Sequence, residues 1–412
     1  MMRQNFTQQS RVIVDLESCR VCKSKRLHSI LSLGEVPLAG DFKKSIDHMD
    51  ERYPLNLIFC ENCKVVQVEK SIDLVRLFNT YSFSSSTIPN LIAHFQEYSQ
   101  WIIRNVNPSS ALEVGCNDGI LLKPLFETGV RVHGVDMSEN ISRIARNRGL
   151  DVKSLKFSIA NLDFIRDWVG EVDLITASNA FPHNDDPNGF LQTAKALLTK
   201  TGVLALEVMY GGNLKSETQW DTVYHEHLHI HTVSSLNYLL KQNTFNLFHI
   251  EWVPMHAGSI RVLASIDQRE KRASVGEFLD IEKRLRLNTL ESWQEFERKS
   301  YESIRTTHEE LLKLHELGHR IWAYGASGRA SMWMNVAELD FVEKIVDASP
   351  LRFDHFLPGT WTPIVSPDQL EEGSPDYTLI TAWNYVESIV SKHPTYNGGW
   401  IVPLPVYREL GK

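Results

Sequence analysis

Two closely spaced pairs of cysteines carry the strongest chemical signal in the sequence. Cys19 and Cys22 are followed, after a 37-residue spacer, by Cys60 and Cys63. Two residues between cysteines let one tight turn present both thiolates to a single ion, and structural zinc takes four such ligands. Four unrelated buried thiols, or one redox pair, are the alternatives, but neither pair lies in a thioredoxin-like strand and helix. We therefore predict one structural zinc ion, which would also stabilise a segment with little apolar core.

A glycine-containing loop follows the apolar residues 111–114. The sequence Glu113-Val-Gly-Cys-Asn-Asp-Gly119 predicts a strand, a turn and a helix, and its glycines allow the backbone to approach a ligand closely. A second strand ends at Asp136, whose carboxylate could hold ribose hydroxyls. The dinucleotide pattern G-x-G-x-x-G is absent, and E-x-G-x-x-x-G followed by this acidic residue favours S-adenosylmethionine. The predicted cofactor-binding residues are Glu113, Gly115, Asn117, Asp118, Gly119, Asp136, Met137 and Asn179, with Cys116 as a loop filler.

Histidines gather in residues 224–231, which read Tyr-His-Glu-His-Leu-His-Ile-His. Imidazole titrates near neutral pH, so Tyr224, Glu226 and His227 could supply a hydrogen-bond donor, a carboxylate and a base to one substrate. A metal cluster is the alternative, but the H-E-x-x-H spacing of metalloproteases is missing. Because the last histidines alternate with apolar residues, a structural role on the polar face of a strand is expected for His229 and His231.

The C-terminal third contains a second unit of strand, small-residue loop and helix, at 320–330. Such a loop presents backbone N–H groups at a helix N-terminus, where phosphate binds readily, and Arg329 adds positive charge. A further strand is expected at 341–347, ending at Asp347. This unit is either a second ligand-binding domain or a duplicate that binds nothing. The charged segment 277–318 predicts a solvated helix that bridges two domains.

The elements that must position these residues alternate between strand and helix. Apolar strands are expected at 111–114, 130–136, 172–178 and 202–208, and His183 follows the third of them. Strands alternating with helices, with ligand loops at their carboxyl ends, form a doubly wound parallel sheet. We predict an α/β protein with a zinc-binding module at 1–80, an S-adenosylmethionine-binding domain at 81–268, and a Rossmann-like domain at 269–412.

Composition narrows the class of protein further. The 412 residues are 42% hydrophobic and 23% charged, which is typical of a folded globular chain. The net charge of −8 argues against non-specific binding to nucleic acid or to anionic membranes. Neither a signal peptide nor an apolar run of membrane-spanning length occurs, so a cytoplasmic location is expected.

The order of these motifs resembles the zinc-containing C-methyltransferases that branch nucleotide-linked deoxysugars. The resemblance covers nearly the whole chain and includes, beyond the motifs above, Gly258-Ser-Ile-Arg261, Pro358-Gly-Thr360 and Ala382-Trp-Asn384. Two positions depart from the family pattern. Tyr-x-Tyr-x-Ser-Ser is replaced by Tyr81-Ser-Phe83-Ser-Ser-Ser86, and Asp-x-Asn-Pro is replaced by Asp347-Ala-Ser349-Pro350.

This resemblance implies methyl transfer from S-adenosylmethionine to C3 of a nucleotide-linked 4-keto-6-deoxyhexose, by a monomer that also holds zinc. We expect His227 to remove the C3 proton, Glu226 to orient that imidazole, and Tyr224 and His183 to stabilise the enolate oxygen. Substrate contacts are expected from Tyr81, Arg261, Tyr324, Ser327, Gly328, Arg329 and Asp347.

Two other functions remain possible from the sequence alone. One is an O- or N-methyltransferase of a small metabolite, which would not need an enolate-forming cluster at 224–227. The other is a non-catalytic zinc-containing protein whose Rossmann-like body binds a partner. Binding of S-adenosylmethionine would separate both enzyme functions from the last one.

Overall fold

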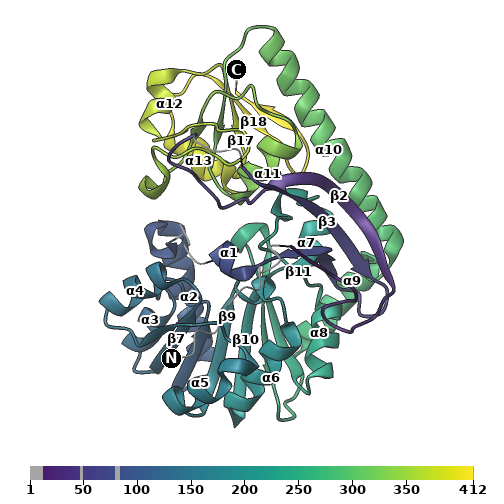
Figure 1. The fold of residues 1–412 in the computed structure, drawn as a ribbon, viewed down its shortest axis with the longest axis vertical. Coiled ribbons are helices and arrows are strands. Elements are labelled where there is room, and N and C mark those ends of the chain that lie inside the picture. The colour runs from purple at the N-terminus through teal and green to yellow at the C-terminus, as the bar shows by residue number, and fades with distance from the viewer. Residues whose placement is uncertain (1–12, 47–49, 79–83, 412) are drawn as a thin grey trace, which may run out of the picture.

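The chain folds into two lobes joined along one side by a long helix (Figure 1). The computed structural model describes residues 13–46, 50–78 and 84–411. The lower lobe in Figure 1 contains a seven-stranded sheet, and the upper lobe contains the C-terminal sheet. Among the described residues, no helix is both long enough and apolar enough to cross a membrane.

The seven-stranded sheet has the order β12-β13-β10-β9-β6-β7-β8, and β13 alone runs antiparallel to its neighbours. The parallel strands β6, β7 and β9 therefore end at one edge. The strands are β6 (Ser110–Val114), β7 (Arg131–Asp136), β8 (Val152–Ser154), β9 (Val172–Ser178), β10 (Leu198–Met209), β12 (Asn246–Val253) and β13 (Ser259–Ser265). The helices of this lobe are α2 (Pro89–Asn105), α3 (Leu122–Glu127), α4 (Glu139–Asn147), α5 (Leu162–Val169), α6 (Pro187–Leu197), α7 (Gly211–Ser216) and α8 (Val233–Gln242).

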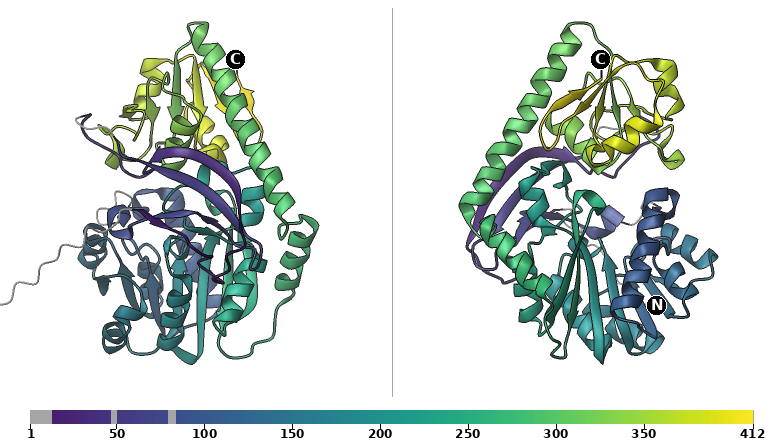
Figure 2. Two further views of the ribbon diagram at one scale, coloured as in Figure 1. Left: turned by 45° about the vertical axis from the view of Figure 1, so that its right-hand side comes forward. Right: turned by 180° about the vertical axis from the view of Figure 1, so that it is seen from behind.

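The N-terminal segment forms a curved hairpin that passes between the lobes and beside the long helix (Figure 2). Its sheet has the order β11-β4-β3-β2, with β2 (Leu27–Pro37), β3 (Arg52–Cys60), β4 (Val66–Val68) and β11 (His229–Ile230). Gly34 adopts a positive φ of 71° where the β2–β3 register shifts, which is how a bulge bends a strand without ending it. Next to it lie β1 (Ile13–Asp15), β5 (Lys70–Ile72) and α1 (Leu74–Phe78).

The C-terminal sheet has the order β16-β15-β14-β17-β18-β19 and is parallel except for β19. The strand expected at 341–347 is shorter than predicted, because only Ile345 and Val346 pair with β14. The strands are β14 (Ile321–Tyr324), β15 (Ile345–Val346), β16 (Ile364–Val365), β17 (Tyr377–Ile380), β18 (Gly399–Val402) and β19 (Arg408–Leu410), with helices α11 (Gly328–Val336), α12 (Asp368–Gly373) and α13 (Val386–Lys392).

The charged segment before this sheet forms two helices, α9 (Ala273–Arg284) and α10 (Leu290–Glu316). Helix α9 packs on β12 and α8 of the lower lobe, whereas α10 runs along both lobes (Figures 1 and 2). Helix α10 is only half solvated, because Trp293, Phe296 and Leu311 are fully buried. These side chains share a core with the β2–β3 hairpin and the C-terminal sheet.

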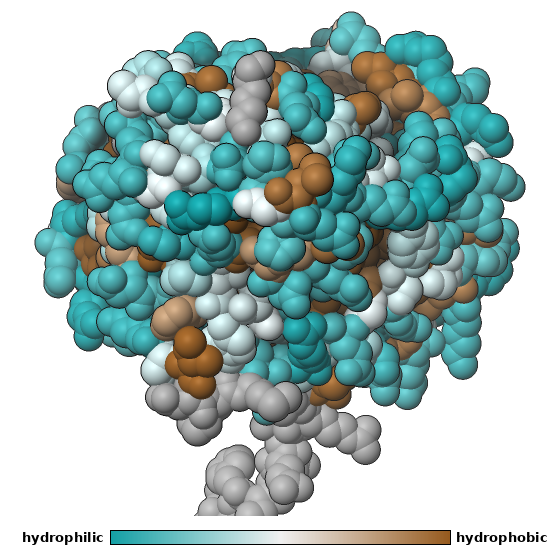
Figure 3. All heavy atoms as spheres, turned by 90° about the horizontal axis from the view of Figure 1, so that it is seen from above, coloured by the Kyte–Doolittle hydropathy of each residue, from teal (hydrophilic) through white to brown (hydrophobic). Residues whose placement is uncertain are grey.

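The predicted fold class is confirmed by the two mainly parallel sheets and the clustered cysteines. Apolar side chains fill the interior of both lobes. On the face seen in Figure 3, hydrophobic residues lie in small groups among hydrophilic ones.

Candidate functional site

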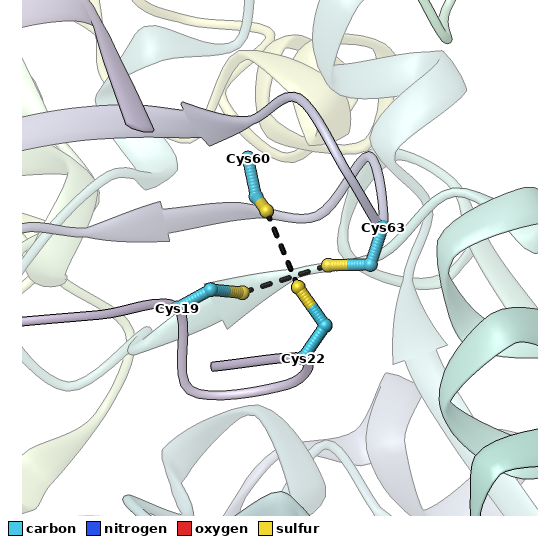
Figure 4. A group of neighbouring side chains, drawn as sticks. All are labelled: Cys19, Cys22, Cys60 and Cys63. Carbon is cyan, nitrogen blue, oxygen red and sulfur yellow. Dashed lines mark hydrogen bonds between the residues drawn. The ribbon is translucent and has the colours of Figure 1, made fainter. Parts of the chain in front are cut away.

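The four paired cysteines converge on one point (Figure 4). Their Sγ atoms all lie within 4.8 Å of one another, and the Cys19–Cys63 and Cys22–Cys60 separations are both 3.5 Å. A tetrahedral zinc ion with Zn–S bonds of about 2.3 Å holds its sulfur ligands about 3.8 Å apart, so the cluster fits zinc. Each Cys-x-x-Cys turn closes alike, with a following lysine in the left-handed region donating its N–H to the first cysteine's carbonyl.

The zinc-binding turns pack directly on the lower lobe. Asn188 at the start of α6 donates hydrogen bonds from Nδ2 to the carbonyls of Arg20 and Val21, at 3.1 and 2.9 Å. Buried Cys19, Cys60 and Cys63 belong to the same apolar core as the seven-stranded sheet. The metal site therefore joins the hairpin to this lobe.

The predicted cofactor residues lie together at the carboxyl ends of β6, β7 and β9. The N–H of Asn117 donates to Asp136 Oδ2 at 3.0 Å, which connects two of these loops. Side-chain oxygens of Glu113 and Asn179 are buried there with no hydrogen-bond partner in the described part of the chain. Burial raises the pKa of Glu113 well above its usual range, and Asp136 and Asp118 raise it further. Unsatisfied buried polar atoms beside left-handed Asn117 and Asn179 fit the polar groups of a bound nucleoside.

The glycines of this loop are required by the protein itself as well as by any ligand. A Cβ on Gly115 would lie 2.3 Å from the Cβ of Ala180, and one on Gly119 would lie 2.2 Å from Leu150 Cδ1. Both glycines also have positive φ angles. Close approach of the backbone to a ligand is therefore only one of two reasons for glycine at these positions, and packing within the protein is the other.

Asp118 holds the loop in place. Its Oδ2 accepts hydrogen bonds from the Ser84 hydroxyl at 2.5 Å and from the N–H and hydroxyl of Ser86. An ion pair at 3.5 Å joins the same oxygen to Arg148. These contacts give Asp118 a positioning role through Oδ2, whereas its Oδ1 is buried without a hydrogen-bond partner among the described residues. Met137 lies beside this loop, and its carbonyl accepts from Ser154 Oγ.

The imidazoles of His183 and His227 stack at a centroid distance of 5.2 Å. The N–H of Leu228 donates to the carbonyl of Pro182, so the backbone brings the two segments together. The ring of Tyr224 lies 4.0 Å from that of His227. Strand β11, directly after this segment, pairs with β4 of the zinc-bearing sheet. The zinc site thus supports the segment that carries His227.

His227 is held in one tautomer. Its Nδ1 lies 2.6 Å from the carbonyl oxygen of Thr222, which can only accept, so Nδ1 carries the proton and Nε2 carries a lone pair. Burial lowers the pKa of His227 well below its usual range, and neighbouring His183 lowers it further. Burial also lowers the pKa of His183 to about 4. Both rings are therefore neutral at physiological pH, and Nε2 of His227 can accept a proton.

Three family models match the chain in succession. Residues 19–78 match a "Putative zinc binding domain", 90–250 a "Methyltransferase domain", and 254–405 a "C-methyltransferase C-terminal domain". C-methyltransferase NovU of Streptomyces niveus is 28% identical over 97% of this chain and 98% of its own length. The chain is thus similar to C-methyltransferases along nearly its whole length.

More distant likenesses are partial. The ubiquinone biosynthesis O-methyltransferase of Bordetella avium is 29% identical over a segment that makes up 26% of this chain and 45% of that relative's length. The magnesium protoporphyrin IX methyltransferase of Synechocystis, solved with bound S-adenosylmethionine, covers 42% of this chain and 78% of its own, with 14% identity and a TM-score of 0.33.

Glu226 was expected to orient His227, but the carbonyl of Thr222 orients this imidazole instead. Glu226 instead points toward the loop at Gly40, where a Cβ would lie 3.4 Å from its Oε1. Its Oε2 is buried without a hydrogen-bond partner among the residues described. Burial raises the pKa of Glu226 from 4.5 to about 7. The carboxyl is thus poised to exchange a proton near neutral pH.

This raised pKa predicts how stability depends on pH. Folding favours the protonated carboxyl, so its stabilisation is complete below the unfolded pKa of 4.5 and is lost as the pH rises through about 7. The side chain introduced by Glu226→Gln stays neutral at every pH. The unfolding free energy of this variant relative to that of wild type should therefore be about 2–3 kcal/mol higher at pH 8 than at pH 5. Urea unfolding at both pH values measures this gain. The control Glu127→Gln, on the exposed surface of α3, should track wild type. Parallel pH dependence of Glu226→Gln and wild type would contradict the assignment.

Three residues that were predicted to bind the substrate already form contacts within the protein. Arg261 is fully buried, with its guanidinium 2.8 Å from Glu207, 2.5 Å from Glu97 and stacked over Tyr98. Tyr324 lies in the C-terminal core with its hydroxyl 3.2 Å from His393 Nε2. Asp347 forms an ion pair with Arg352 at 3.0 Å. These contacts favour positioning roles for all three residues, and Tyr81 lies outside the described residues.

The loop at 327–329 lies against the histidine cluster, as its predicted role requires. Ser327 precedes the first turn of α11, and a Cβ on Gly328 would lie 3.0 Å from Tyr224 Cζ. Arg329 donates to the His256 carbonyl at 3.1 Å and stacks on Trp383 at 5.0 Å. His229 lies in β11, and His229 and His231 are buried and hydrogen-bonded to each other, which agrees with the structural role expected of them.

Sequence reasoning missed two residues of this region. His256 has a left-handed backbone, with φ of 53°, in the turn Met255–Ala257, and burial lowers its pKa to about 4. A positive charge on His256 would lower the pKa of both His183 and His227, which indicates that the three side chains are near one another. A lone histidine before Gly258 carries little signal by itself. Asp221 is buried at the junction of the lobes, and its isolated position in the sequence gave no indication of this.

Proposed function

We propose that this C-methyltransferase transfers a methyl group from S-adenosylmethionine to C3 of a nucleotide-linked 4-keto-6-deoxyhexose, through an enolate. The observation that carries the proposal is the fixed tautomer of His227, which leaves the Nε2 lone pair free of partners within the described residues. Methylation at carbon needs such a base, because the C–H bond must first be broken.

The donor would bind at the loops after β6, β7 and β9. Gly115 and Asn117 would form the turn beneath it, and Asp136 would face the ribose hydroxyls. The buried oxygens of Glu113 and Asn179 would gain hydrogen-bond partners on binding. Bound S-adenosylmethionine supplies an electrophilic methyl group on a sulfonium.

His227 Nε2 would remove the C3 proton, and the C–H electron pair would become the enolate. Tyr224 and His183 flank this imidazole and would stabilise charge on the C4 oxygen by hydrogen bonding. The C3 carbon then forms its bond to the methyl group, and the sulfur keeps the electron pair of the broken S–C bond. The water-poor surroundings that lower the pKa of His227 also strengthen these interactions.

The diphosphate of the sugar nucleotide would bind at Ser327, Gly328 and Arg329. Support comes from the backbone N–H groups at the start of α11 and from the guanidinium beside them. Because Gly328 contacts Tyr224, this anion site adjoins the proposed base. The local positive charge explains how an acidic chain could hold a diphosphate.

Replacing Gly328 with alanine should lower kcat/KM by at least about tenfold, because the new methyl group would press on the ring of Tyr224 and displace it. Steady-state kinetics with the keto sugar measure the effect. Gly276→Ala is the matched control, since a Cβ there meets nothing within 4 Å and α9 is far from the histidines in sequence. Equal activity of the two variants would contradict the proposed packing.

Incubation with a panel of nucleotide-linked 4-keto-6-deoxyhexoses and S-adenosylmethionine tests the proposed function. Mass spectrometry should show one methyl added to at least one member of the panel. Calorimetry with the nucleoside diphosphate alone should show that Arg329→Ala binds more weakly than wild type. An unmodified panel would refute the substrate class, and unchanged affinity in Arg329→Ala would remove the diphosphate site.

A further inference from the structure

A buried carboxylate lies where the two lobes meet. Asp221, in the 3₁₀ turn Trp220–Thr222, has no exposed surface. Its Oδ2 accepts hydrogen bonds from the indole N–H groups of Trp333, at 3.1 Å, and Trp383, at 2.8 Å. Its Oδ1 is buried without a hydrogen-bond partner in the part of the chain that the structure describes. Both indoles belong to the C-terminal lobe, so Asp221 fixes this turn to that lobe.

The residue after Asp221 holds the proposed base. The carbonyl of Thr222 accepts from Nδ1 of His227 at 2.6 Å, which sets the tautomer and limits rotation of the ring. A shift of the turn would move this carbonyl and free the imidazole. The position of Asp221 therefore controls the group that orients His227.

The same indoles connect to the proposed diphosphate site. The guanidinium of Arg329 lies 5.0 Å from the ring centroid of Trp383, which donates to Asp221. Arg329 also donates to the His256 carbonyl in the other lobe. A continuous path thus leads from Arg329 to His227 through Trp383, Asp221 and Thr222. Asp221 and Thr222 are joined by a peptide bond, and every other step is a direct contact.

We propose that Asp221 is a positioning residue that couples the substrate-binding C-terminal lobe to the tautomer and orientation of His227. This inference rests on the proposed function of His227 as the base. An apolar residue would stabilise the junction as well as a buried carboxylate does, since desolvating the charge is costly. A carboxylate oxygen, unlike an apolar group, can hold two indoles and the turn in one fixed geometry.

The test compares Asp221→Asn with Asp221→Leu. The asparagine oxygen can replace Oδ2 and accept both indole bonds, whereas leucine leaves both indoles unpaired. We expect Asp221→Leu to lower kcat by about 10- to 100-fold at unchanged KM for S-adenosylmethionine, because the imidazole is misplaced. Asp221→Asn should recover activity to within about threefold of wild type. Equal kcat in wild type and Asp221→Leu, or equal losses in both variants, would overturn the proposal.

A matched control removes another carboxylate that accepts an indole bond. Glu343 accepts from Trp322 Nε1 at 3.1 Å within the C-terminal lobe, outside the path to His227. Glu343→Leu should lower stability while keeping kcat. A fall in kcat equal to that of Asp221→Leu would show a general loss of stability and overturn the proposal. If Asp221→Leu does not fold, Trp383→Phe removes one indole N–H and should lower kcat in the same way.

A spectroscopic readout separates this inference from the proposed function. ¹⁵N NMR of histidine-labelled protein should show His227 as a single Nδ1–H tautomer in wild type and as a mixture in Asp221→Leu. Addition of thymidine diphosphate, as a probe for the anion site, should sharpen the wild-type signal only. Inactivity of wild type toward every keto sugar would refute the proposed function alone, whereas an unchanged tautomer in Asp221→Leu would refute the coupling alone.

Discussion

Replacing His227 with alanine is expected to lower kcat by about 10³-fold, because the base that we propose removes the C3 proton is lost. Binding of S-adenosylmethionine should persist, since His227 lies on the segment after α7 and not in the loops of β6, β7 and β9. Wild type should also exchange the C3 proton of the keto sugar with deuterated water without the donor, and His227→Ala should not. Steady-state kinetics and NMR of the sugar measure the two effects.

The control for this variant is His28→Ala. His28 is half-buried on β2 and its side chain pairs only with Glu61 among the residues described, so its loss should leave kcat and exchange unchanged. A rate close to that of wild type for His227→Ala would remove His227 as the base. Loss of transfer with intact C3 exchange would show that another group removes the proton.

Loss of zinc is the second large effect we expect, because the four cysteines join the hairpin to the lower lobe. Cys19→Ser should lower the unfolding free energy by at least about 3 kcal/mol, which for a chain of 412 residues corresponds to a Tm lower by roughly 3–4 °C or more. The hairpin shares one core with the C-terminal sheet, and the cysteines share another with the lower lobe. Activity should fall with stability, since β4 supports β11 and the segment of His227.

Cys116→Ala is the matched control for the zinc prediction. Cys116 is the fifth cysteine, buried in the glycine loop and outside the cluster of four. Its loss should change the Tm by only about 1 °C and leave one zinc per chain in elemental analysis. A zinc content and Tm of Cys19→Ser equal to those of Cys116→Ala would contradict a four-cysteine structural site.

The sequence predicted the features that depend on local patterns. The Cys-x-x-Cys spacing, the glycine turn after 111–114 and the small-residue loop before Arg329 each encode their geometry in a few neighbouring residues. Hydrophobic strands at 111–114, 130–136, 172–178 and 202–208 were also found where the seven-stranded sheet has them. Such patterns can be recognised in the sequence because the alternation of strand residues and the residue preferences of turns depend on near neighbours.

Features that depend on distant contacts were not predictable in the same way. The carbonyl of Thr222, rather than the carboxylate of Glu226, orients His227, and no side-chain pattern encodes a backbone acceptor. Arg261 looked available for a phosphate until its partners Glu207 and Glu97 were known. The length of β2 was not predictable either, because the bulge at Gly34 that lets this strand bend and continue depends on its pairing with β3.

One measurement tests the central claim, which is methylation at carbon through removal of the C3 proton. The protein is incubated with S-adenosylmethionine and a nucleotide-linked 4-keto-6-deoxyhexose that carries deuterium at C3. We expect mass spectrometry and NMR to show a product that has gained one methyl group at C3 and lost the deuterium. A methylated product that keeps its C3 deuterium would contradict this claim, because the methyl group would then lie on another atom.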